Sequence, residues 1–78
     1  MIKKNIEMKY ETGDKVQLIS GGPEMTVIGI VGTGELTKLE NAALKKEGAI
    51  DGDIYCGWHN NTIEERGVFK GNVLKKLS

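Results

Sequence analysis

Polar and apolar residues alternate in two short segments near the amino-terminal end of the chain. Lys15–Ile19 (KVQLI) and Met25–Val31 (MTVIGIV) both open with the two-residue period of a half-buried strand. The intervening Ser20-Gly21-Gly22-Pro23 favours a turn, because glycine tolerates positive φ and proline fixes φ. We therefore predict two strands folded back on each other. Gly29, in the second, is a candidate bulge or point of close backbone approach.

A helical spacing of apolar residues follows over Glu35–Glu47, formed by Leu36, Leu39, Ala43 and Leu44. Thr33 or Gly34 is the candidate start of this helix. Gly48 is the candidate end, since glycine is common just past a helix terminus. We predict a short helical insertion (35–47) that lies across one opening or edge of the sheet.

The carboxyl-terminal part again has strand character. Ile54–His59 and Thr62–Phe69 are strand-like runs, and Asn60-Asn61 between them suits a hairpin turn because Asn tolerates positive φ. Val73–Leu77 is a short turn or a last strand. Short strands at this spacing predict a mainly β protein, a small antiparallel barrel of four to five strands. Its expected interior is made of Val16, Leu18, Met25, Val27, Cys56 and Phe69.

Length allows a single domain, which we place at 13–78. The 78 residues can build only one small core. Residues 1–12 form an amino-terminal extension or an edge strand, since Ile6, Met8 and Tyr10 alternate with polar residues. The chain has no apolar run of the roughly 20 residues that a membrane helix needs. It also lacks the apolar core of a signal peptide, and its one cysteine cannot form an internal disulfide, so we expect a cytoplasmic protein.

Charge weighs against a general nucleic-acid binder. Eleven basic and eleven acidic side chains give a net charge of zero, whereas such proteins need an excess of Lys and Arg. A local basic patch stays open as an alternative, because the two chain ends of a domain often lie close together. Its lysines would be Lys3, Lys4, Lys9, Lys70, Lys75 and Lys76.

Two glycine motifs resemble nucleotide-binding loops but lack the parts that such loops need. Gly32-Thr33-Gly34 stands between a strand and a helix, yet Thr37 replaces the third glycine of a dinucleotide fingerprint, and no repeated βαβ units surround it. The segment 20–23 leads into a strand rather than a helix and has no following lysine, so it is no phosphate loop. We read both as structural turns and expect no cofactor.

Reactive side chains are few. Cys56 and His59 are the single thiol and the single imidazole, and a spacing of three on a strand points them to opposite faces. One Cys and one His are also too few for a zinc site. Glu64 and Glu65 are adjacent on a strand and face opposite ways, so they form no catalytic pair. We therefore expect no catalytic residues, no metal and no enzyme activity.

Several motifs together resemble the YodC-like family of small uncharacterised bacterial proteins. These motifs are GDKVQLISGGPEMTV at 13–27, Cys56 and Trp58 in DIYCGWHNN at 53–61, and then Phe69 and Leu74. The resemblance implies an SH3-like β-barrel and carries no established activity, substrate or cofactor. It also implies that the loop at 20–23 forms one wall of a binding groove.

The function we predict is a non-enzymatic module that binds a protein or peptide. Its candidate binding residues come from the turn and from the third strand: Gly21, Gly22, Pro23, Tyr55, Trp58 and His59. Trp58 either fills the barrel interior or lines the groove. The alternative is a small nucleic-acid-binding barrel that uses the terminal lysines and the aromatic residues of the strands.

Overall fold

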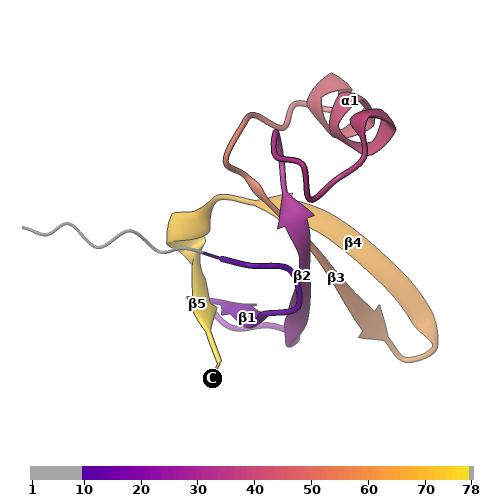
Figure 1. Ribbon diagram of the computed structural model, residues 1–78. Helices are drawn as coiled ribbons and strands as arrows, with labels where there is room; N and C mark the ends of the chain where they lie inside the picture. The colour runs from indigo at the N-terminus through magenta and orange to yellow at the C-terminus, as the bar shows by residue number, and fades with distance from the viewer. Residues whose placement is uncertain (1–9, 78) are drawn as a thin grey trace, which may run out of the picture.

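The computed structural model describes residues 10–77 and consists of five strands, one helix and a 3₁₀ turn. In chain order these are β1 (Lys15–Leu18), β2 (Met25–Ile30), α1 (Lys38–Lys46), β3 (Ile54–Asn60), β4 (Ile63–Phe69), the 3₁₀ turn Gly71–Val73 and β5 (Leu74–Lys76). The mainly β class and the single short helix are confirmed (Figure 1). The β3–β4 turn is also confirmed, but it lies at Asn61-Thr62, one residue later than expected, because Asn60 still pairs with Ile63. Asn61 has the positive φ of such a turn, 61°.

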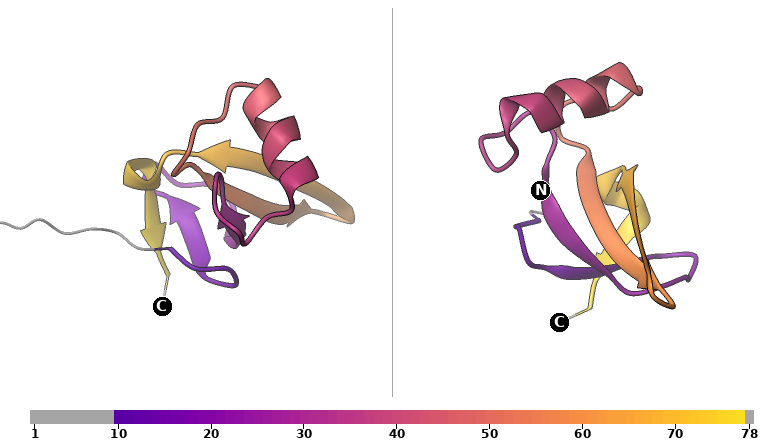
Figure 2. Two further views of the ribbon diagram at one scale, coloured as in Figure 1. Left: turned by 45° about the horizontal axis from the view of Figure 1, so that its top comes forward. Right: turned by 90° about the vertical axis from the view of Figure 1, so that its right-hand side faces the viewer.

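All strand pairs are antiparallel, in the order β4-β3-β2-β1-β5. The sheet curls around its core, and α1 stands at one end of it (Figure 2). Within residues 10–77, β4 and β5 do not pair, so the curled sheet stays open along one seam. The arrangement is compatible with an SH3-like barrel, but the sheet is not closed. The reason is that Lys70–Val73 turns the chain away from β4, and β5 pairs with β1 instead.

The core lies on the inner, concave face of the sheet. Of the six expected interior residues, Val16, Met25, Val27 and Cys56 are buried, while Leu18 and Phe69 are partly buried and pack against them. The same cluster also contains Tyr10, Ile54 and Leu74. Alternation along the strands therefore predicted the correct inward face.

Tyr10 joins the core from outside the domain limits expected from the sequence. Its ring is buried, and its hydroxyl donates to the carbonyl oxygens of Gly71 (2.8 Å) and Leu74 (3.1 Å). The Lys76 ammonium lies 5.7 Å from the ring centroid and 3.3 Å from the Asp14 carboxylate. These contacts fasten the chain just before β1 to β5. Residues 1–9, and with them most of the expected extension or edge strand, lie outside the described residues.

The β2–α1 connection contains a bulge and a close contact, as expected for Gly29. The β2–β3 register shifts between Val27 and Gly29. Leu36 then packs over the outer side of Gly29, where an added Cβ would lie only 2.6 Å from Leu36 Cδ2. Leu36 is 5% exposed, so this leucine covers the sheet before the helix begins.

The helix is shorter than expected, because it begins at Lys38 rather than at Glu35. Thr37 is its N-cap and forms a capping box with Glu40, in which each side chain accepts the other residue's backbone N–H. Gly48 follows the helix with a φ of 109°, as expected for the residue past a helix end. The Thr37-x-x-Glu40 spacing was the sequence signal for this start.

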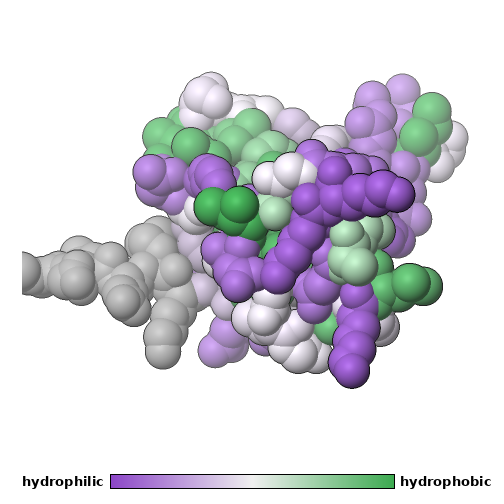
Figure 3. Space-filling view, turned by 90° about the horizontal axis from the view of Figure 1, so that it is seen from above, coloured by the Kyte–Doolittle hydropathy of each residue, from purple (hydrophilic) through white to green (hydrophobic). Residues whose placement is uncertain are grey.

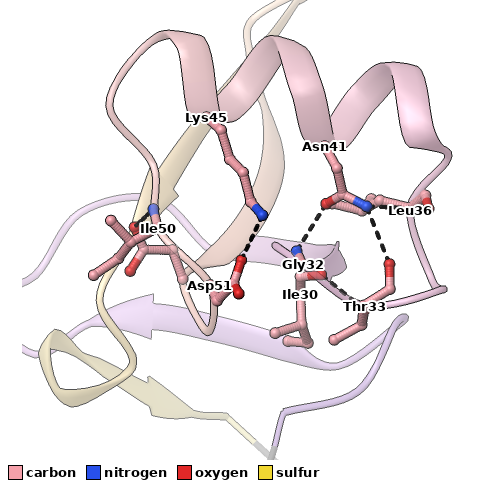
Figure 4. Close-up of polar contacts among 9 residues, drawn as sticks. Ile30, Gly32, Thr33, Leu36, Asn41, Lys45, Ile50 and Asp51 are labelled. Carbon is pink, nitrogen blue, oxygen red and sulfur yellow. Dashed lines mark hydrogen bonds and ion pairs between the residues drawn. The ribbon is translucent and has the colours of Figure 1, made fainter.

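Polar contacts, rather than a buried apolar stripe, hold α1 in place (Figure 4). No residue of α1 is buried, and Leu39 is 81% exposed. Asn41 Oδ1 accepts the backbone N–H of Gly32 (2.8 Å), and Asn41 Nδ2 donates to the carbonyl of Thr33 (3.1 Å). Lys45 Nζ lies 2.7 Å from Asp51 Oδ1. Within residues 10–77, no helix is both long and apolar enough to cross a membrane.

Candidate functional site

The β1–β2 turn is shaped by its two glycines. Gly21 and Gly22 have φ values of 110° and 118°, a region that side chains with a Cβ rarely adopt. Gln17 Nε2 donates to the carbonyl of Gly22 (2.6 Å), and the N–H of Gly21 donates to Leu18 (2.9 Å). Neither glycine is among the residues that line the three depressions described below. Their role is to set the path of the turn and so to position Pro23.

Pro23 faces the tip of the β3–β4 hairpin. Together with Trp58, His59 and Asn60 it lines a shallow hollow of about 280 Å³, which we call the turn–hairpin hollow. Pro23, His59 and Asn60 are exposed, and Trp58 is half-buried. The structure thus brings together three of the six residues expected from the sequence. Asn60 is the member that sequence analysis missed, because it was read only as a turn residue.

Trp58 serves both the core and the surface. Its ring packs against the core cluster and lies 6.1 Å from the Phe69 ring, at an interplanar angle of 51°. Gly67, on the neighbouring strand, leaves room for both rings, since an added Cβ would lie 3.3 Å from each. Trp58 is therefore half-buried: it packs against the core cluster and also lines the turn–hairpin hollow.

A second groove of about 430 Å³ adjoins the hollow across the sheet. Its floor contains Thr26 and Gly57, which are register partners on β2 and β3. Lys15, Glu24 and Glu64 contribute charges of both signs to its lining. Trp58 and His59 line this groove as well, so the two depressions share these residues.

Tyr55 lies apart from the other expected site residues. It lines a separate cleft of about 520 Å³ between α1 and the outer face of β3 and β4, which we call the helix–sheet cleft. Arg66 Nη1 lies 3.5 Å from the Tyr55 hydroxyl oxygen, and Arg66 Nη2 lies 2.9 Å from Glu64 Oε2. The α1 wall includes Ala43 and Leu44.

Seen from the α1 side, hydrophobic residues form separate patches on the surface of the molecule, with hydrophilic residues between them (Figure 3).

The floor of the helix–sheet cleft holds a buried carboxylate. Asp53 Oδ1 accepts from Lys70 Nζ (2.9 Å), and Oδ2 accepts from the N–H of Ile50 (3.1 Å). Burial alone would raise the pKa of Asp53, but the Ile50 and Lys70 contacts outweigh burial and lower it. Asp53 is therefore a satisfied structural anion rather than an acid or base poised near neutrality.

Cys56 and His59 do not form a reactive pair. Cys56 is buried in the core, and burial raises the pKa of its thiol to about 11. His59 lies exposed on the other face of β3. Within residues 10–77, no three His, Cys, Asp or Glu side chains are grouped so that they could hold a metal ion.

Two of the three carboxyl-terminal lysines form ion pairs with carboxylates. Lys70 pairs with Asp53, and Lys76 pairs with Asp14. Lys75 is exposed on β5, opposite Gln17. The other lysines of the proposed basic patch, Lys3, Lys4 and Lys9, lie outside the described residues.

The described residues form a small, mainly β domain with one curled antiparallel sheet and a single helical insertion. The chain belongs to the family described as "Uncharacterized small protein (DUF2158)", whose model matches residues 11–74. This match begins beside Tyr10 and ends at Leu74, so it spans β1 to β4 with the helical insertion. No curated protein and no solved structure matches the chain.

Proposed function

We propose that this protein is a non-catalytic module that binds a peptide segment of a partner protein at the turn–hairpin hollow. The observation that carries the proposal is the convergence of Pro23, Trp58 and His59 on one open depression. A tryptophan held by packing on one side and open on the other offers a large contact area at a low cost in side-chain entropy.

The size and chemistry of the hollow favour a peptide side chain over a small-molecule substrate. Its volume of about 280 Å³ lies just below the range for ligand pockets, roughly 300–1,000 Å³. The rings of Pro23 and Trp58 would contact an apolar side chain. His59 and Asn60 can form hydrogen bonds with the peptide backbone around it.

The chemistry of the reactive residues supports a non-catalytic role. A thiol with a pKa of about 11 is protonated at neutral pH and is a poor nucleophile. His59 cannot activate this thiol, because its side chain lies on the opposite, exposed face of β3. For the nucleic-acid alternative, the pairing of Lys70 and Lys76 with carboxylates leaves less free positive charge for phosphates.

Two finer assignments belong to the same proposal. We place the protein in the YodC-like group within its family, on the residue matches from Gly13 to Leu74. We also place it in the cytoplasm, where the lone, unpaired Cys56 would stay reduced.

A random peptide library displayed on phage tests the proposed function. Selection on the wild-type protein should enrich peptides with a shared apolar residue. The double variant Pro23→Asp/His59→Glu should bind these peptides at least about tenfold more weakly, because it places two carboxylates around the apolar contact. The exposed Lys75→Glu change on β5 is the matched control and should have no such effect. Absence of a consensus, or equal binding by the double variant, would contradict the proposal.

A further inference from the structure

The β4 strand forms a long free edge of the sheet. Its seven residues, Ile63–Phe69, all pair with β3 in one unbroken register. Within residues 10–77, no second strand pairs with β4, and no backbone hydrogen bond outside the β3 ladder involves residues 63–69. In an antiparallel strand about half of the N–H and C=O groups point away from the partner, so those of β4 face outward with no backbone partner among residues 10–77. The other edge strand, β5, has only three residues.

From this geometry we propose that the β4 edge accepts an extended segment of a different protein as a sixth strand of the sheet. Strand addition of this kind takes its affinity from backbone hydrogen bonds and its specificity from side-chain contacts on alternate residues. The site is separate from the turn–hairpin hollow, so this proposal does not depend on the proposed function.

The helix–sheet cleft gives such a strand a place for its outward side chains. Val68 and Arg66 of β4 line this cleft together with Lys70, which follows the strand, and Ala43 and Leu44 of α1 lie on the opposite side. Val68 is half-buried, and a partner side chain beside it would complete its apolar surroundings. An apolar residue is therefore favoured opposite Val68.

Charges on β4 argue against a second copy of the same strand as the occupant. A symmetric antiparallel pair centred on Glu64, Glu65 or Arg66 places that residue opposite its own copy. Centring on Val68 places Arg66 opposite Lys70. Like charges directly opposite each other destabilise a sheet, and charged residues are a common protection of edge strands.

The remaining central register, on Gly67, avoids like charges but places Glu65 opposite Phe69. That pairing would put a carboxylate against an aromatic ring without a counter-charge. A heterologous strand has no such conflict. Arg66 and Glu64 pair with each other at 2.9 Å, but their side chains stay 47% and 54% exposed. An acidic residue opposite Arg66 and a basic residue opposite Glu64 would extend this pair into a network of alternating charges.

A synthetic peptide with this pattern tests the proposal. In acetyl-STVTETKTS-amide, run antiparallel to β4, valine faces Val68, glutamate faces Arg66 and lysine faces Glu64. Added to ¹⁵N-labelled full-length protein at up to about 1 mM, it should shift the amide resonances of Ile63–Phe69 and slow their hydrogen exchange about tenfold. Resonances around Pro23 should not move, which separates this outcome from failure of the proposed function.

Charge exchange supplies the control. Replacing the glutamate of the peptide by lysine should weaken binding to the wild-type protein about fivefold, and the Arg66→Glu variant should restore it. The peptide-side change needs no folded variant, so it keeps its meaning if Arg66→Glu is unstable. Three outcomes would overturn the proposal: no β4 shifts at about 1 mM peptide, equal binding of both peptides, or β4 shifts that appear on concentrating the protein alone.

Discussion

At the scale of single residues, Gly29 and Leu36 determine how closely the α1 insertion approaches the sheet. Leu36 lies directly over the missing side chain of Gly29, with its Cδ2 at 2.6 Å and its Cγ at 2.9 Å from an ideal Cβ position. Leu36 is buried although it precedes the helix. The contact explains why β2 carries a glycine in the middle of an otherwise β-branched run.

Gly29→Ala should therefore destabilise the protein by about 1–3 kcal/mol, because the new methyl group overlaps Leu36 and forces it to move. Urea unfolding followed by the fluorescence of Trp58, the single tryptophan, measures the change. Leu36→Ala alone should cost about 2 kcal/mol or more through the cavity that it leaves.

The double variant Gly29→Ala/Leu36→Ala is the matched control for that contact. It should lose less stability than the sum of the two single changes, since the shorter side chain removes the overlap. Strictly additive losses would show that Leu36 does not lie on Gly29.

Asp53 should make the free energy of unfolding depend on pH in the acidic range. Its pKa in the folded protein is lowered from the ordinary value, so its contribution is present above about pH 4 and is lost as the pH falls through the folded-state pKa. Asp53→Asn should cost about 1–3 kcal/mol at pH 7 by weakening the contacts to Lys70 and Ile50. The difference from wild type should shrink below about pH 4.

Asp51→Asn provides the comparison for this carboxylate. Asp51 also pairs with a lysine, but its side chain is 75% exposed, so the pair should contribute at most about 1 kcal/mol. If Asp53→Asn and Asp51→Asn had equal effects at pH 7, Asp53 would not be the buried anion described above.

At the scale of elements, the strands were predictable and the helix boundaries were not. Alternation places Val16, Val27 and Cys56 on one face, and a strand has only two faces to choose from. The helix start is different, because the spacing of Leu36 allows two interpretations: a residue of the helix, or a residue before the helix that packs over Gly29. Only the capping pair Thr37 and Glu40 separates the two interpretations, and that pair indicates the start at Lys38.

Asn41→Ala should loosen α1 without unfolding the sheet. The helix has no buried residue, so the hydrogen bonds of Asn41 to Gly32, Thr33 and Leu36 are a main attachment. Amide hydrogen exchange within Lys38–Lys46 should become about tenfold faster, while exchange in β2 and β3 stays the same.

Lys46→Ala, on the same helix, is the control for Asn41→Ala and should leave the exchange rates near those of the wild type. An Asn41→Ala variant with unchanged exchange in α1 would mean that Lys45, through Asp51, or Leu36 alone fixes the helix.

At the scale of the whole molecule, the sequence predicted only part of how the candidate site residues are grouped. Pro23, Trp58 and His59 meet as expected, but Tyr55 opens into the helix–sheet cleft. The division arises because α1 covers the outer face near Tyr55, whereas the hairpin tip extends past it toward the β1–β2 turn. Such distances between loops depend on how the whole sheet curls, which no local pattern records.

Sequence analysis also did not predict that the sheet stays open between β4 and β5. Alternation in β4 and β5 predicts strands but does not say whether these two edges pair with each other. Tyr10 closes the core beside β5 through its bonds to Gly71 and Leu74, so the molecule needs no β4–β5 ladder. Among residues 10–77 this leaves β4 as an edge strand.

The emission of Trp58 tests most directly whether the turn–hairpin hollow binds peptides. Because Trp58 is the only tryptophan, the fluorescence reports on the surroundings of this one ring, which also borders the turn–hairpin hollow. Saturation with a peptide selected on the wild-type protein should shift the emission to shorter wavelength and reduce quenching by acrylamide, as the exposed part of the ring becomes covered. An unchanged spectrum and unchanged quenching, with binding of the same peptide established by calorimetry, would contradict the account.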